Sequence, residues 1–204
     1  MRIFHSLMII SMGLFLMLGS ARADRVSMAE AHVTDMIAAA QVILRDEAIS
    51  AEDKEAGIRS LMTRYFDIGG ITRASAGQYW RKATPAQQER YSELFAEVLK
   101  STAIGQFDQL RTLEFIPTRS TEKGPKMVLV GGRIVDNSGV QPDAIVNWRV
   151  ATREGKPPSI IDIEIENISL LITQRQENQA IIRKNNGAFQ ALIDTLESQI
   201  STAD

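Results

Sequence analysis

The sequence predicts an α+β domain, in which helices pack on one face of a curved, mainly antiparallel four-stranded sheet. Two changes of periodicity predict this class. Apolar residues recur three and four positions apart through residues 26–110, as in amphipathic helices, and then alternate with polar residues through residues 113–166, as in strands. Helical spacing returns at residue 169. Because short turns separate the strand segments, we expect antiparallel pairing.

The first 23 residues are predicted to be a secretory signal peptide. Arg2 supplies a positive charge, the run Leu7–Leu18 is almost entirely apolar, and Ala21-Arg22-Ala23 has the small residues that signal peptidase accepts. A retained membrane anchor is the competing interpretation, but a run of 12 residues is shorter than the span of about 20 that a bilayer needs. We therefore expect cleavage after Ala23 and an exported, soluble protein.

Residues 24–204 are expected to form one domain with a single core. Removing Arg2 and Arg22 leaves 21 basic and 25 acidic residues, a net charge of −4. A mildly acidic chain of this kind is not typical of nucleic-acid-binding proteins. The chain has no cysteine, so packing has to stabilise it without disulfides.

The first predicted helix covers residues 26–45, where apolar residues form one stripe. Ser50, followed three positions later by an acidic residue, is predicted to cap the start of the second helix. The pair Gly69-Gly70 is predicted to break or bend the chain before a short helix at residues 72–81.

The segment Thr84-Pro85-Ala86-Gln87 predicts the start of a further helix, which is expected to run to about residue 110. Thr84 can cap the helix, Gln87 can bond back to the cap, and Pro85 occupies the first helical position, where its missing N–H costs nothing.

Four strands are predicted, at residues 113–118, 126–136, 144–152 and 159–166. The pair Gly131-Gly132 is interpreted as a bulge or bend that curves the sheet. Helices are predicted at residues 169–184 and, after Gly187, towards the end of the chain, where the apolar residues are Phe189, Leu192, Ile193, Leu196 and Ile200.

The residues offer no catalytic signature. Residues 24–204 contain one histidine, His32, which we interpret as structural because no nucleophile motif accompanies it. There is no glycine-rich phosphate loop and no ligand cluster for zinc. Asp162, Glu164 and Glu166 could suggest a calcium or acid–base site, but we interpret them as a solvated strand face opposite the isoleucines. Composition alone leaves open whether the apolar residues fill a core or line a ligand cavity.

Two blocks of sequence resemble a known family. The first reads Tyr65-Phe66-Asp67, then GQYWRKATPAQQ from Gly77 to Gln88, then Tyr91 and Phe95. The second reads DIEIENISL from Asp162 to Leu170, followed by Gln174, Arg175 and Gly187. Over residues 67–110 and 159–200 the chain is similar to the MlaC family, also called the toluene-tolerance family of periplasmic lipid-binding proteins. Asn167 stands where the family usually has glycine, but asparagine tolerates a left-handed backbone, so we expect the turn to survive. Ala76 stands where a leucine is common.

The resemblance implies a periplasmic lipid carrier that shuttles phospholipid between the outer membrane and an inner-membrane lipid ABC transporter, and so serves outer-membrane lipid asymmetry. Its expected partners are the lipid, the transporter complex and an outer-membrane lipoprotein–porin complex. A hopanoid-associated branch, and an exported small-ligand-binding protein or enzyme on a similar fold, remain alternatives. We expect no enzymatic activity, no cofactor, no metal site and no nucleic-acid partner, and we expect a monomer in which residues 24–204 form one lipid-binding domain.

The apolar pocket is expected between the sheet and the helices, since alternation with polar residues places each set of apolar strand residues on one face. Whether Val128, Val130 and Ile134, or Met127, Leu129 and Val135, face inward stays open because both sets are apolar. The predicted lining consists of Val146, Trp148, Val150, Ile161, Ile163 and Ile165 from the strands and of Phe66, Phe95 and Leu99 from the helices.

Overall fold

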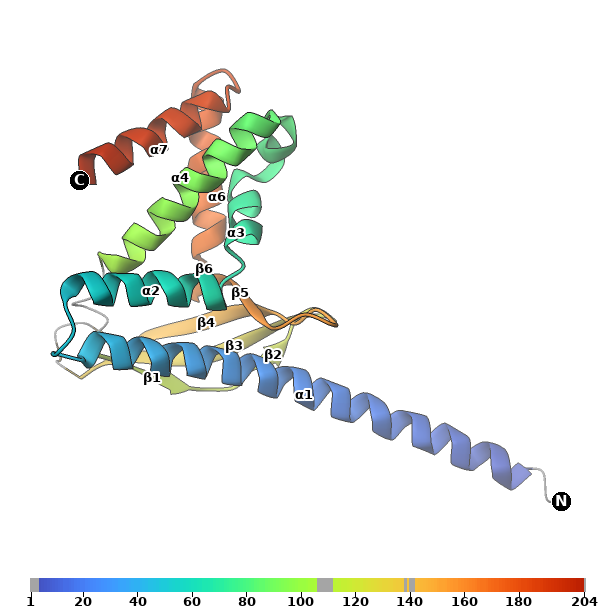
Figure 1. Ribbon diagram of the computed structural model, residues 1–204. Coiled ribbons are helices and arrows are strands. Elements are labelled where there is room, and N and C mark those ends of the chain that lie inside the picture. The colour runs from blue at the N-terminus through green and yellow to red at the C-terminus, as the bar shows by residue number, and fades with distance from the viewer. Residues whose placement is uncertain (1–3, 106–111, 138, 140–141, 204) are drawn as a thin grey trace.

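The computed structural model describes residues 4–105, 112–137, 139 and 142–203, with the backbone alone for residues 4–23 and 203. It is an α+β fold in which an antiparallel sheet lies beside helices α1 and α2, while helices α3, α4, α6 and α7 gather in a second group (Figure 1). The fold class predicted from the sequence is confirmed.

Helix α1 spans Phe4–Arg45 and helix α2 spans Ala51–Tyr65. The two helices run beside one another along the sheet (Figure 1). The predicted cap is present, because the hydroxyl of Ser50 accepts a hydrogen bond of 3.0 Å from the amide of Asp53.

Helix α3 spans Ile68–Ala76, so the prediction that Gly69-Gly70 breaks the chain was wrong. The Asp67 carboxylate caps this helix by accepting a hydrogen bond of 2.8 Å from the amide of Gly70. A Cβ atom on Gly70 would lie 2.5 Å from that carboxylate, so the glycine makes room for the cap. The break comes later, at Gly77, whose φ of 58° is in the left-handed region. The 3₁₀ helix η1 (Gly77–Lys82) follows.

Helix α4 spans Pro85–Ile104 and begins with the predicted capping box. The Thr84 hydroxyl accepts from the Gln87 amide at 3.2 Å, and the Gln87 side chain accepts from the Thr84 amide at 3.1 Å. The predicted end of this helix, near residue 110, lies outside the described residues.

The sheet contains the four predicted strands, β1 (Leu113–Pro117), β3 (Met127–Asp136), β4 (Ala144–Ala151) and β5 (Ser159–Ile165), in the order β1-β3-β4-β5. All pairs are antiparallel. Two strands of two residues were not predicted: β2 (Thr121–Glu122) pairs with β3, and β6 (Ile168–Ser169) pairs with β5.

The irregularity in the sheet lies in β5 rather than at the glycine pair of β3. Pairing of β3 with β4 continues through Gly131 and Gly132. Gly132 instead gives room to Phe115, because a Cβ atom there would lie 2.0 Å from its ring. In β5, Arg149 pairs with Asp162 whereas Val150 pairs with Ile160, so Ile161 is an extra residue. This is the geometry of a β-bulge.

Helices α6 (Leu170–Lys184) and α7 (Gln190–Ala203) complete the chain. The β5–β6 turn has Asn167 at φ 63°, so the left-handed position expected for this asparagine is confirmed. Ser169 then caps α6 by accepting a hydrogen bond of 3.0 Å from the amide of Ile172.

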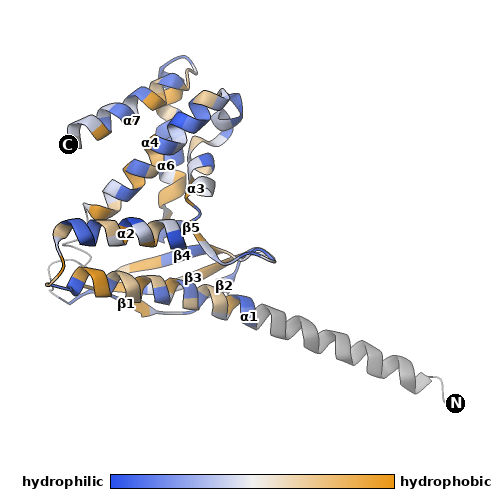
Figure 2. Cartoon of the chain, viewed as in Figure 1, coloured by the Kyte–Doolittle hydropathy of each residue, from blue (hydrophilic) through white to orange (hydrophobic). Residues whose placement is uncertain are grey.

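The buried side chains form two clusters rather than the single core that the length suggests. The helical cluster joins η1 with α3, α4, α6 and α7 and includes Tyr91, Phe95, Ile182 and Leu192. The sheet cluster lies between α1 and the inner face of the sheet and includes Val33, Val128, Val150 and Ile160. Figure 2 shows hydrophobic residues along β3, β4 and the part of α1 beside the sheet.

Candidate functional site

The inner face of the sheet, which α1 covers, carries five of the nine predicted lining residues. Trp148 pairs with Ile163 on one side and Val130 on the other, and Val146 pairs with Ile165. Residues directly opposite one another share a face, so these side chains form one apolar surface. The five residues are Val146, Trp148, Val150, Ile163 and Ile165, of which Val146 and Val150 are at most 1% exposed.

The bulge in β5 changes which residues of that strand point to the inner face of the sheet. Ile160, which is fully buried, pairs with Val150 and belongs to the sheet cluster, while Ile161 is the extra residue and is half-buried. Ile165 shares the inner face with Val146 but is 38% exposed at the end of the strand.

The three predicted helical residues divide between the two clusters. Phe66 packs against both clusters. Phe95 and Leu99 belong to the helical cluster, in which Phe95 stacks on Tyr91 with ring centroids 5.3 Å apart. The predicted lining residues that belong to a cluster are therefore divided between the two clusters, which Phe66 connects.

The structure also decides which face of β3 points inward. Val128 and Val130 are 1% and 2% exposed and pack in the sheet cluster, so the set Val128, Val130 and Ile134 shares the inner face. The sequence could not separate this set from the alternating one because both are apolar.

The interpretation of the β5 carboxylates as a solvated face was wrong for two of the three residues. Asp162 and Glu164 are 5% and 9% exposed, and Arg149 forms an ion pair with each. Asp162 also accepts a hydrogen bond of 2.6 Å from the Ser169 hydroxyl and one of 2.9 Å from the Leu171 amide. The carboxylate thus anchors the start of α6 to the outer face of β5, which is a structural role.

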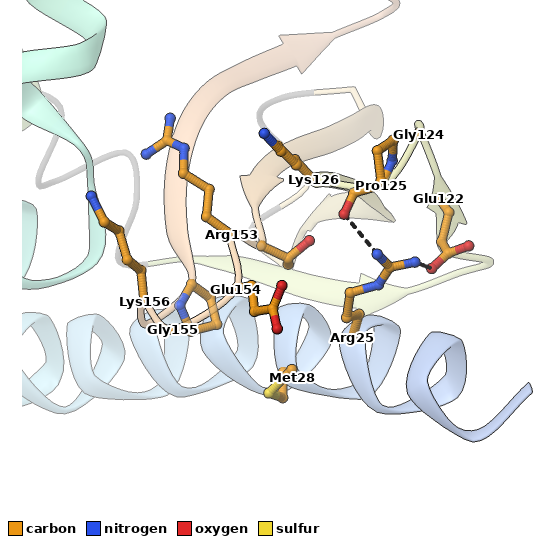
Figure 3. A pocket seen from close by; sticks show the side chains of 12 residues that line it. Arg25, Met28, Glu122, Gly124, Pro125, Lys126, Arg153, Glu154, Gly155 and Lys156 are labelled. Carbon is orange, nitrogen blue, oxygen red and sulfur yellow. Dashed lines mark hydrogen bonds and ion pairs between the residues drawn. The ribbon is translucent and has the colours of Figure 1, made fainter. Parts of the chain in front are cut away.

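A pocket of about 1130 Å³ lies where the inner face of the sheet ends (Figure 3). Its walls come from the early part of α1, the turn between β2 and β3, and the loop between β4 and β5. Its lining residues are Arg25, Met28, Glu122, Gly124, Pro125, Lys126, Thr152, Arg153, Glu154, Gly155, Lys156 and Pro158. None of the nine residues predicted to line a pocket is among them.

Four cationic side chains line this pocket, against two acidic ones. Arg25 donates to the carbonyl of Pro125 at 2.6 Å and forms an ion pair with Glu122, which ties α1 to the β2–β3 turn. Arg153 forms an ion pair of 3.2 Å with Asp67. Within the described part of the chain, Lys126 and Lys156 have no ion-pair partner. Their charge is therefore uncompensated by a direct contact.

This pocket was not predicted from the sequence, although one signal was available. Lys126 and Thr152 continue the alternation of β3 and β4 just beyond the strand ends, and the Thr152 amide donates to the Lys126 carbonyl at 2.9 Å. On α1, Arg25 lies four residues before Ala29 and eight before Val33, which are both fully buried. Each element thus changes from apolar to polar residues at the same end, and two of these residues, Arg25 and Lys126, are cationic.

A second pocket of about 350 Å³ adjoins the first and shares Arg153, Lys156 and Pro158 with it. Arg64, Arg73 and Asp67 also line it. Two cationic side chains of the β4–β5 loop, Arg153 and Lys156, therefore line both pockets.

His32 has the structural role predicted for it. Its ring nitrogen Nε2 lies 3.0 Å from the carbonyl oxygen of Tyr65, and the two rings are 4.9 Å apart, which joins α1 to α2.

Among the described residues there is no group of histidine and carboxylate side chains that could hold a metal ion. In the same part of the chain, no helix has both the length and the apolarity to cross a membrane.

Two comparisons with known proteins found similarities. A family model described as MlaC protein matches residues 34–198. A solved structure, the phospholipid-binding protein from Ralstonia solanacearum in complex with a phospholipid, has a TM-score of 0.72 and 19% sequence identity, covering 85% of this chain and 97% of that chain. A comparison with curated protein sequences found no match.

Proposed function

The chain belongs to the MlaC family, and from this membership we propose that it is a carrier that binds a phospholipid or a similar lipid and moves it through the periplasm. The similar solved protein is described as phospholipid-binding, which supports a lipid as the ligand here. A signal peptide of 23 residues, cleaved after Ala23, would deliver residues 24–204 to that compartment as one lipid-binding domain.

One observation carries the proposal: the apolar inner face of the sheet ends in an open pocket with a cationic lining. The volume of about 1130 Å³ compares with roughly 300–1,000 Å³ for typical small-molecule sites. Acyl chains would lie along the inner face beneath α1, in contact with Val146, Trp148, Val150 and Ile163, while the polar headgroup would remain in the pocket.

The physical need for such a carrier follows from the cost of exposing acyl chains to water. A diacyl lipid has about 30 chain methylenes, and exposing each costs ~0.8 kcal/mol. The total is on the order of 20 kcal/mol, so unaided transit through water is negligible. A carrier has to enclose the chains but breaks no bond, and we therefore propose that the protein is not an enzyme.

The proposed partners follow from the same role. Lipid would pass between an inner-membrane lipid ABC transporter complex and an outer-membrane lipoprotein–porin complex. The cationic pocket favours a ligand with an anionic headgroup, which argues for phospholipid over a hopanoid.

The test is to purify the protein from its native periplasm, extract it with organic solvent and analyse the extract by mass spectrometry. We expect near-stoichiometric lipid with two acyl chains. A non-lipid metabolite in the extract would favour the small-ligand alternative, and an extract without any ligand, together with no lipid uptake from vesicles, would contradict the carrier function.

A further inference from the structure

The inner face of the sheet and the facing side of α1 share one polarity gradient. In the sheet, the pairs Val130–Trp148 and Val128–Val150 are followed by Lys126 and Thr152, joined by the 2.9 Å hydrogen bond between their backbones. On α1, Val33 and Ala29 are followed by Arg25 at the same spacing of four. The gradient therefore runs from a dry apolar layer to a cationic pocket, as an amphiphilic ligand requires.

Two buried polar atoms at the cationic end have no hydrogen-bond partner among the described residues. They are Oγ1 of Thr152, a residue that is 7% exposed, and Nε of Arg25. Both residues line the pocket. Buried polar groups in folded proteins are nearly always hydrogen-bonded, so these two atoms are available to bond a polar ligand in the pocket.

The chemistry of this pocket fits an anion with several acceptor oxygens. The Arg25 Nε–H and the Thr152 hydroxyl are donors, and Lys126 and Lys156 supply uncompensated positive charge. Figure 3 shows Lys126 next to Pro125, to which Arg25 is hydrogen-bonded, and Arg153 and Lys156 on the β4–β5 loop, with the side chains of the three residues directed away from Arg25. A phosphate ester offers acceptor oxygens to several donors at once.

We propose that this pocket is a phosphate-binding subsite, which recognises the phosphodiester of a lipid headgroup while the acyl chains lie along the inner face of the sheet. The inference rests on the proposed carrier function. It adds that the headgroup contains a phosphate and that four residues bind this phosphate: Arg25, Lys126, Thr152 and Lys156. The carrier accordingly discriminates between lipids with the same chains by their phosphate.

The test compares two lipids with identical acyl chains, phosphatidylglycerol and diacylglycerol, of which only the first has a phosphate. Lipid-free protein is incubated with vesicles that contain both lipids, separated from the vesicles, and extracted to measure the ratio of the two lipids bound. The key variant is Lys126→Gln/Lys156→Gln. The control is Lys100→Gln/Lys184→Gln, which removes the same charge from α4 and α6, away from the pocket.

We expect the wild-type protein and the control to select phosphatidylglycerol, and the pocket variant to lose about tenfold of that selectivity while its diacylglycerol loading stays unchanged. Equal selectivity in the pocket variant and the control would overturn the phosphate subsite but leave the carrier function intact. Failure of the wild-type protein to load either lipid would instead contradict the carrier function.

Two further experiments distinguish binding of the lipid phosphate from attraction to a charged membrane and from binding of free phosphate. If the lysines acted by attracting the protein to an anionic membrane surface, the loss of selectivity would disappear when the lipids are supplied in neutral detergent micelles, which would overturn the subsite. Inorganic phosphate, titrated into lipid-free protein by calorimetry, should bind far more weakly than phosphatidylglycerol, because it has no acyl chains. Equal affinity for the two would assign the pocket to the free anion.

Discussion

At the scale of single residues, the hydroxyl of Tyr91 joins three helices inside the helical cluster. It lies 2.6 Å from the Ser75 hydroxyl on α3 and accepts a hydrogen bond of 2.9 Å from the Asn178 amide on α6. Ser75 donates its own proton to the carbonyl of Thr72, so the Tyr91 hydroxyl donates to Ser75. Asn178 is fully buried, and this network therefore fixes the relative positions of α3, α4 and α6.

Replacing Tyr91 with phenylalanine should lower the free energy of unfolding by about 1–3 kcal/mol, because Ser75 and Asn178 lose a buried partner. Urea denaturation at pH 7, followed by circular dichroism, measures this. A variant as stable as the wild-type protein would show that the network contributes nothing.

The same residue predicts a loss of stability in alkali. Burial raises the pKa of the Tyr91 phenol, and the hydrogen bond with Ser75 offsets a smaller part of that rise. An unfolded tyrosine loses its proton near pH 10 while the native one keeps it, so the free energy of unfolding should fall as the pH rises above about 10. Denaturation at pH 7 and above pH 10 should show a smaller fall for Tyr91→Phe, and an identical fall in both proteins would contradict this assignment.

Thr152 allows a residue-scale test of the pocket that needs no charged substitution. Thr152→Val removes a buried hydroxyl without a partner, so lipid-free protein should become more stable by about 1 kcal/mol. Lipid-loaded protein should lose this gain, because the hydroxyl then bonds the headgroup. Thermal unfolding of both forms measures the difference, with Thr121→Val on the exposed edge of β2 as the control expected to change little. The same gain in loaded and lipid-free protein would place the headgroup elsewhere.

At the scale of elements, the start of α4 has a complete capping box, and losing this box should lower the stability of the protein by a predictable amount. Thr84→Ala should destabilise the protein by ~1 kcal/mol without changing lipid loading. Thr102→Ala is the matched control, since this exposed threonine lies near the end of the same helix and bonds only a carbonyl of its own helix. A normal melting temperature combined with lost lipid transfer would give Thr84 a functional role instead.

The elements that sequence predicted well are those with a local cause. The caps at Ser50 and Thr84 and the strands of the sheet depend on neighbouring residues and periodicity, and they are present. The early start of α3 escaped prediction because Asp67 turns a glycine pair, normally a helix breaker, into a capped first turn. The bulge in β5 escaped because Ile160 and Ile161 are both apolar, and the partner strand decides which of them points inward.

At the scale of the whole molecule, the pocket could not be predicted because residues far apart in the sequence form it. Arg25 reaches Glu122 and Pro125 across nearly a hundred positions, and the β4–β5 loop closes the other side. Periodicity identified the apolar face of β4 but not where that face ends. It also could not separate the sheet cluster from the helical cluster, so Phe95 and Leu99, which lie in the helical cluster, were grouped with the strand residues.

A charge on the inner face should prevent lipid loading while the helical cluster stays folded. Ile163→Asp places a carboxylate where the acyl chains are proposed to lie, and an unpaired carboxylate is strongly disfavoured there. Ile163 is half-buried, which favours a folded variant. Val42→Asp is the matched control, since Val42 on α1 is 70% exposed. Mass spectrometry should find little lipid in the first protein and a normal amount in the second, and equal loading would contradict the proposed wall.

Each of the two clusters contains one of the two tryptophans of the chain. Trp80 packs in the helical cluster, whereas Trp148 lies on the inner face, edge-on to Phe115 with ring centroids 6.4 Å apart. Intrinsic fluorescence therefore reports the two halves separately once Trp80→Phe or Trp148→Phe leaves a single emitter. The emission maximum of Trp148 will follow the polarity beneath α1 as lipid enters and leaves, while that of Trp80 stays constant, so transfer between carrier and membrane can be timed without attaching a dye.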